Sequence, residues 1–84
     1  MAEHHDWLQV TLDQNHRRGI AEQVETSSDP NNDARGPLLR ILRSSRNELL
    51  LDRKQGELVL NALNVDRQMS ALRARLEAFL ADTR

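Results

Sequence analysis

Apolar side chains recur at alternating intervals of three and four residues along the C-terminal half of the sequence. The stripe runs from Leu51 to Phe79 and is interrupted by a polar side chain only at Gln55. This spacing places side chains on one face of an α-helix and, held over several heptads, is typical of a coiled-coil seam. We predict an interaction seam that consists of Leu51, Leu58, Ala62, Val65, Met69, Leu72, Leu76 and Phe79.

The surroundings of this stripe change along the sequence. From Asp66 onward its flanks are polar, whereas between Leu58 and Val65 apolar residues surround the helix, which favours the centre of a multi-helix core. A second stripe of small residues runs on the opposite face: Ala71, Ala74, Ala78 and Ala81. These alanines predict either a solvent-exposed face, because Ala is the best helix former, or a second helix contact.

The composition from Pro37 onward is helical, and Pro37 suits the first turn of a helix. We predict a mainly α fold with one long amphipathic helix, or a helical hairpin, over about residues 37–82. Gly56 decides between the two, and the unbroken heptad phase across it favours one helix. At about 1.5 Å per residue such a helix would span roughly 70 Å, so we expect it to pack with an N-terminal helix in a small intermolecular bundle.

The chain is predicted to form one domain with three parts. Residues 1–25 form an acidic segment that is helical, with Asp13 as an N-cap, or that contains a short strand at 7–12, where Leu8, Val10 and Leu12 alternate with polar residues. Residues 26–36 are rich in Ser, Asp, Asn and Pro and are predicted to be a loop. Residues 37–84 form the helical or coiled-coil region, and no internal repeat is evident.

The composition favours oligomerisation. The 84 residues contain one Trp, one Phe, no Tyr and no Cys. A core this small therefore lacks large aromatic rings, disulfides and thiolate zinc sites as a means of stabilisation. The first residues carry no signal-peptide pattern, and no apolar stretch approaches the length of a membrane span. We expect a cytoplasmic protein without a membrane segment.

Charge is unevenly distributed, although the net charge is only −1. Acidic residues dominate positions 1–33, and a basic face is predicted from Arg40, Arg43, Arg46, Arg53 and Lys54. This face is either solvated and balanced by the acidic segment, or a surface for phosphate or an acidic partner. No aromatic side chains lie among the arginines for base stacking, which argues against nucleic acid.

The sequence contains no motif for catalysis or metal binding. His4, His5 and His16 lack the spacing of a metal site, and the three glycines are too far apart to form a phosphate loop. We predict no catalytic residues, cofactor, metal or small-molecule substrate, and hence a non-enzymatic protein.

Two functions follow. The first is a protein–protein interaction module (an adaptor, chaperone-like protein, assembly factor or inhibitor) that is a homo-oligomer, binds a protein partner, or both. The alternative is a small dimeric DNA-binding regulator or antitoxin of the ribbon–helix–helix type. It would use the strand-like segment Leu8–Leu12 and place Gln9 and Thr11 in the major groove.

Overall fold

Two short strands and four helices make up the described part of the chain, which is residues 7–66 and 69–81 of this computed structural model. The elements are β1 (Leu8–Thr11), α1 (Gln14–Ser27), α2 (Arg35–Leu42), β2 (Glu48–Leu51), α3 (Arg53–Asp66) and α4 (Ser70–Ala81). Helices predominate, as the composition predicts. The parts of the predicted segments that fall on residues 1–6, 67–68 and 82–84 lie outside the described residues.

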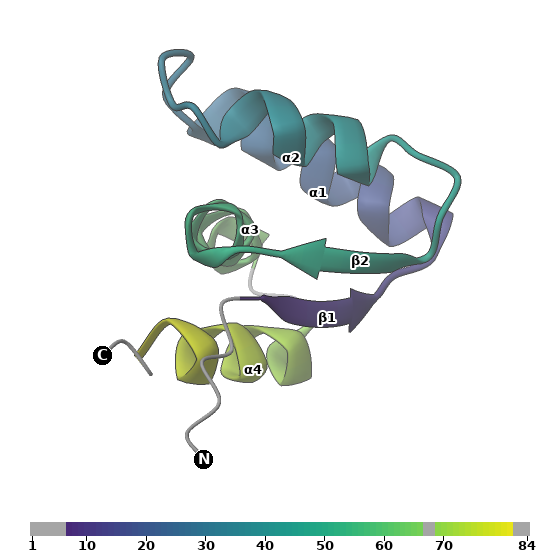
Figure 1. Cartoon of the computed structure of the whole chain (residues 1–84), viewed down its shortest axis with the longest axis vertical. Helices are drawn as coiled ribbons and strands as arrows, with labels where there is room; N and C mark the ends of the chain where they lie inside the picture. The colour runs from purple at the N-terminus through teal and green to yellow at the C-terminus, as the bar shows by residue number, and fades with distance from the viewer. Residues whose placement is uncertain (1–6, 67–68, 82–84) are drawn as a thin grey trace.

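The strands β1 and β2 form an antiparallel sheet between the α1–α2 pair and α4 (Figure 1). Its paired residues are Leu8–Leu51, Gln9–Leu50, Val10–Leu49 and Thr11–Glu48. Val10, Leu49 and Leu51 are buried, whereas the alternate positions on both strands are exposed. A strand is one of the two structures predicted for residues 7–12, and β1 lies in that segment.

The prediction of one long helix or hairpin over 37–82 is wrong, because β2 divides this region. Leu is a good helix former, and a run of Leu residues carries no clear period of its own, so the sequence predicts a helix for ELLL. In the fold, pairing with β1 buries Leu49 and Leu51 on one face, and this tertiary contact decides the conformation. The backbone turns directly after β2, where Asp52 caps α3.

Gly56 lies inside α3 and does not end a helix. The Asp52 side chain accepts a hydrogen bond from the main-chain N–H of Gln55 at 2.8 Å, and the Gln55 side chain accepts one from the Asp52 N–H at 3.0 Å. This reciprocal pair is a capping box that starts the helix just upstream of the glycine. A Cβ at Gly56 would lie 3.4 Å from the Phe79 ring, so an alanine fits there in ordinary van der Waals contact with α4 and a larger side chain does not.

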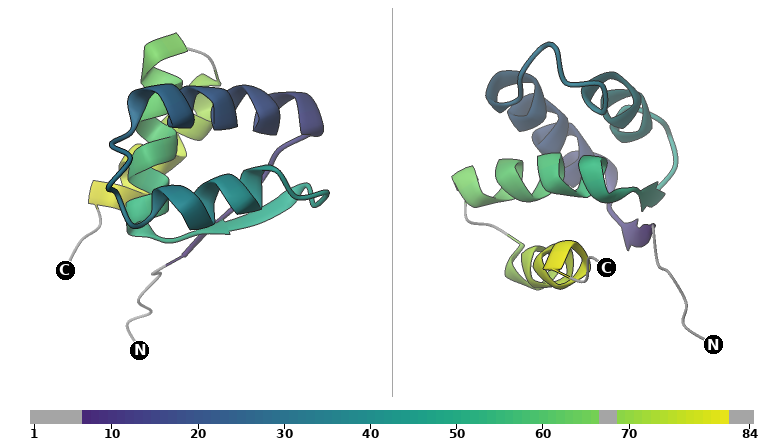
Figure 2. Two further views of the ribbon diagram at one scale, coloured as in Figure 1. Left: turned by 90° about the horizontal axis from the view of Figure 1, so that it is seen from above. Right: turned by 60° about the vertical axis from the view of Figure 1, so that its left-hand side comes forward.

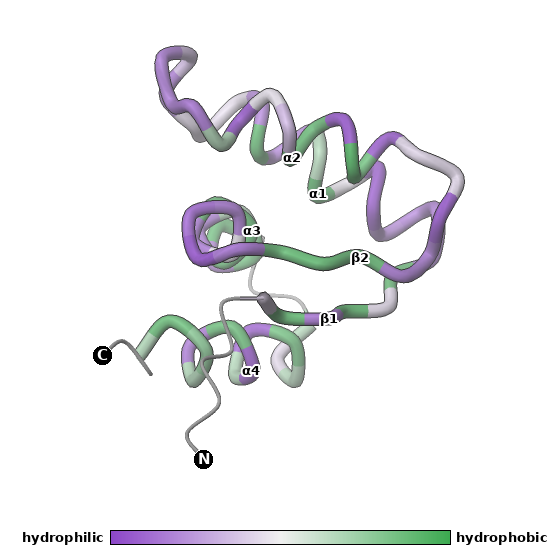
Figure 3. Tube along the Cα trace, in the orientation of Figure 1, coloured by the Kyte–Doolittle hydropathy of each residue, from purple (hydrophilic) through white to green (hydrophobic). Residues whose placement is uncertain are grey.

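The helix α3 lies at the centre of the packing, in contact with α1 on one side and α4 on the other (Figure 2). The fully buried side chains come from most elements of the chain and include Leu38, Leu42, Leu51, Leu76, Val10, Val24 and Val59. The tube in Figure 3 is hydrophobic along β2 and hydrophilic in the adjoining loop. Within the described residues, no helix combines the length and the apolar character needed to cross a membrane.

The element order β-α-α occurs twice, which the sequence alone does not reveal. In both halves a strand is followed by an aspartate that caps the next helix: Asp13 accepts from the His16 N–H as Asp52 does from the Gln55 N–H. The spacing between Asp13 and Asp52 also separates Val10 from Leu49, and these two residues are paired in the sheet. An approximate twofold axis therefore passes through the Val10–Leu49 pair and relates the two strands.

Candidate interaction surface

The predicted interaction seam is largely used within the chain itself. Six of its residues are buried in the core: Leu51, Leu58, Ala62, Leu72, Leu76 and Phe79. Met69 is half-buried, and Val65 is 63% exposed. Met69 has a left-handed backbone (φ 56°) directly before α4, and the seam runs from Leu51 at the end of β2 through α3 to α4, two helices that pack on each other. The apolar stripe therefore offers another chain little accessible surface.

The predicted second helix contact is exposed. Ala71, Ala74, Ala78 and Ala81 all lie on the solvent side of α4. Small side chains on an exposed helix face favour helix formation by themselves, and they identify no partner.

The residues of the predicted basic face make different contacts in the structure. Arg43 forms an ion pair with Glu25 at 2.7 Å, with both side chains largely exposed. Arg53 lies over the Phe79 ring at 5.4 Å and donates to the Phe79 main-chain oxygen. Lys54 is exposed, whereas Arg40 and Arg46 border one groove. The five cations therefore make different contacts, and two of them, Arg40 and Arg46, belong to a different feature.

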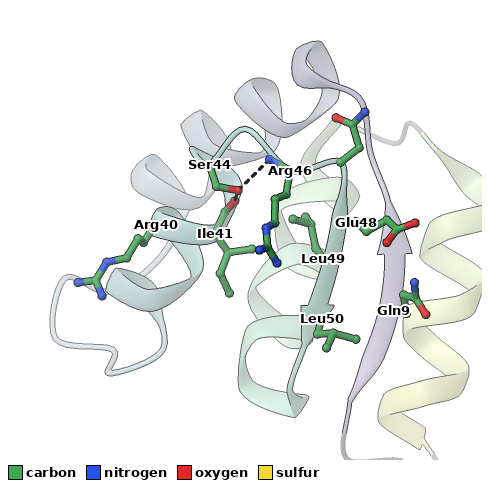
Figure 4. Close-up of a pocket in the computed structure, with 9 residues that line it drawn as sticks. Gln9, Arg40, Ile41, Ser44, Arg46, Glu48, Leu49 and Leu50 are labelled. Carbon is green, nitrogen blue, oxygen red and sulfur yellow. Dashed lines mark hydrogen bonds between the residues drawn. The ribbon is translucent and has the colours of Figure 1, made fainter.

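That feature is a groove of about 880 Å³ between α2 and β2, and it reaches over the exposed face of the sheet to Gln9 of β1, the residue paired with Leu50. Arg40, Ile41 and Ser44 form its helical wall, and Glu48, Leu49 and Leu50 form its strand wall. Figure 4 shows the Arg46 side chain extending along the groove between α2 and β2. Leu50 is 56% exposed, which is unusual for a large apolar side chain in a strand.

The hydrogen-bond pattern of the sheet determines which backbone groups face this groove. Leu12 donates to the Asn47 main-chain oxygen at 2.8 Å, one step beyond the Thr11–Glu48 pair. Hydrogen-bonded pairs alternate along an antiparallel ladder, so the N–H and C=O groups of Leu49 and Leu51 point toward β1. Those of Glu48 and Leu50 therefore point away from β1. Outside the strand ladder, the described residues provide no backbone partner for either of them.

The other edge of the sheet is covered. By the same alternation the carbonyl of Gln9 points away from β2, and it accepts a hydrogen bond from Arg75 Nη2 of α4 at 2.8 Å. The helix α4 packs along β1. This arrangement bears on the alternative prediction: Gln9 and Thr11 are exposed, but β1 pairs within its own chain and α4 lies at its outer edge.

The end of the groove is fixed by a buried arginine. Arg17 of α1 is only 3% exposed, and it donates to the Ser44 main-chain oxygen and, at 3.2 Å, to Asn47 Oδ1. The main-chain N–H of Arg46 donates to Ser44 Oγ at 3.3 Å. These contacts hold the connection between α2 and β2, so the groove has a defined wall on both sides.

Among the residues that the structure describes, Asp13 is the one titratable group with a shifted pKa. The hydrogen bond from the main-chain N–H of His16 lowers the pKa of Asp13, with a smaller contribution from the charges of His16 and Arg17. Asp13 is an N-cap on the surface, so the shift reflects helix capping and indicates no catalytic site. Among residues 7–66 and 69–81, no group of three His, Asp or Glu side chains is arranged to hold a metal ion.

Sequence reasoning missed the open edge because it missed β2. In the structure the positions of Glu48–Leu51 are alternately exposed and buried, but the sequence of this segment, with three consecutive Leu residues, does not show that alternation. Comparison with protein-family models, curated proteins and solved structures finds no match for this chain. The role of the groove is therefore inferred from its geometry alone.

Proposed function

We propose that this protein is a non-enzymatic protein–protein interaction module that associates through the groove between α2 and β2. The observation that carries the proposal is the unpaired edge of β2, which borders an open groove and presents an exposed Leu50. Unpaired strand edges bind extended segments of other chains through main-chain hydrogen bonds.

The other features of the groove support this proposal. Ile41 is half-buried on the helical wall, which adds apolar surface opposite β2. Arg40 and Arg46 are exposed at the rim, and neither has an ion-pair partner among the described residues. An apolar centre with a charged rim is the usual composition of a protein interface.

Light scattering on the pure protein tests the proposal. We expect a mass above 9.7 kDa that rises with concentration from the micromolar to the near-millimolar range. Leu50→Asp should lower this mass, because a carboxylate at the centre of the groove opposes burial. Val65→Asp is the matched control, since Val65 is equally exposed (63%) but lies outside the groove. A protein that stays at 9.7 kDa at every concentration and binds no extended peptide of another protein contradicts the proposal.

A further inference from the structure

We infer that the groove is occupied by β2 of a second copy of this chain, in an antiparallel pair centred on Leu49. The inference rests on the proposed function and specifies its partner. Two identical strands that pair edge to edge are related by a twofold axis, which is the commonest symmetry of protein dimers. The product is a four-stranded sheet, in the order β1, β2, then β2 and β1 of the second copy.

The directions of the backbone N–H and C=O groups limit the registers in which two β2 strands can pair. Glu48 and Leu50 carry the outward-pointing N–H and C=O groups, so in a symmetric pair each must face an outward-pointing residue of the second copy. Glu48 can face Glu48, Leu50 can face Leu50, or Glu48 can face Leu50. These are the three symmetric registers that use the outward groups of β2.

The charges select one of the three. With Glu48 opposite Glu48, two carboxylates meet across the strands, and with Leu50 opposite Leu50, Glu48 lies opposite Asp52 of the second copy. Like charges directly opposite one another destabilise a sheet. With Glu48 opposite Leu50, Arg46 lies beside Asp52 of the second copy, and the same contact recurs at the other end of the pair. This register alone avoids like-charge pairs and gains two attractive ones.

The same register provides cover for Leu50. The Leu50 side chains of the two copies then lie on one face of the sheet as diagonal neighbours, about 7–8 Å apart by their backbones, within reach of long side chains. Arg46, which is exposed at the groove, would be placed to reach Asp52 of the second copy. The carboxylate of Asp52 already caps α3 through one oxygen, so its position is fixed for this contact.

A proline at the outward N–H tests the edge. Leu50→Pro removes an N–H that the ladder with β1 does not use, so the sheet within the chain should survive, as edge-strand prolines do. We expect a loss of the dimer, seen as an increase of at least tenfold in its dissociation constant by sedimentation. Thr11→Pro is the control, because it removes the equivalent outward N–H of β1 away from the groove. It should lower stability similarly and leave dimerisation unchanged.

Disulfide trapping tests the register, and the absence of native cysteine makes each introduced thiol unique. Two single variants, Glu48→Cys and Leu50→Cys, are oxidised separately and as a mixture, with one variant carrying a mass tag. Paired strands bring opposite Cα atoms to about 5.5 Å, whereas diagonal positions at about 7–8 Å are too far apart for a disulfide. We expect cross-linked heterodimers from the mixture and little cross-linking of either variant alone.

The outcomes separate the two proposals. Cross-linking of one variant with itself would show another register and overturn the inference. A wild-type dimer that gives no cross-link and tolerates Leu50→Pro would overturn the inference while leaving the proposed function in place. A chain that never exceeds 9.7 kDa and binds no extended peptide of another protein would overturn both. Binding of an extended peptide from another protein to the monomer, without dimerisation, would also overturn the second copy as the occupant.

Discussion

Arg75 of α4 donates a hydrogen bond from Nη2 to the main-chain oxygen of Gln9 in β1, at 2.8 Å. The two residues lie far apart in the sequence, and the contact closes one edge of the sheet. The opposite edge, on β2, has no such cover and borders the groove. A helix contacts each strand, but only the outward carbonyl of β1 has a hydrogen-bond partner among the described residues.

Removal of this contact should loosen the covered edge. We expect Arg75→Ala to lower the free energy of unfolding by about 1 kcal/mol, because a hydrogen bond to a charged donor is lost at an exposed site. The measurement is the urea midpoint. Arg40→Ala is the control, since Arg40 is exposed and lies beside the other edge. Equal midpoints for the two variants would show that Arg75 has no role at β1.

Arg17 should matter more, because it is buried. We expect Arg17→Ala to reduce the free energy of unfolding by about 2 kcal/mol or more, since Ser44 and Asn47 lose a charged donor. Hydrogen exchange of the 43–47 connection should accelerate at the same time. Arg18→Ala, at the next and exposed position of α1, should change stability by no more than about 0.5 kcal/mol. A large loss for Arg18→Ala would contradict this assignment.

Gly19 in α1 and Gly56 in α3 differ in the space that is available for a larger side chain. Gly56→Ala and Gly19→Ala should each stabilise the protein by about 0.5–1 kcal/mol through helix propensity, because the added Cβ meets no clash at either site. Substitution by leucine, in contrast, should affect stability differently at the two positions. Nothing lies within 4 Å of a Cβ at Gly19, whereas the Phe79 ring lies at 3.4 Å from one at Gly56. Gly56→Leu should therefore cost about 1–3 kcal/mol and Gly19→Leu should not, as thermal unfolding can show.

Asp13 should make the stability of the protein depend on pH in the acidic range. Its pKa is lowered from the ordinary value of 3.8 in the folded protein, chiefly by the hydrogen bond from the His16 main-chain N–H. A carboxyl with a lowered folded pKa adds stability above its unfolded pKa, and this contribution is lost as the pH falls through the folded pKa. Asp13→Asn keeps a capping side chain without this titration. The variant should lose less helical circular dichroism than the wild type on acidification below pH 3.8, and identical curves would contradict the cap.

Local signals in the sequence identify the helical character and the cap at Asp13, because periodicity and capping depend on neighbouring residues. The strand β2 depends on a distant partner. Leu49 and Leu51 favour a helix by propensity, and only their pairing with Val10 and Leu8 makes them a strand. The heptad was a correct sign of burial, but it could not tell whether another helix of the same chain or a second chain provides the cover.

The repeated β-α-α order gives a further meaning to the groove. In a fully symmetric molecule, α2 would close the edge of β2 as α4 closes the edge of β1, and Figure 4 shows both helices beside their respective strands. The two halves differ at this point, since α4 supplies Arg75 to a strand carbonyl while α2 leaves a groove. In a fully symmetric version, both edges of the sheet would be covered in the same way. The difference between the two halves thus confines the proposed strand pairing to the β2 edge, so that each chain could pair with one other chain and not with a series of them.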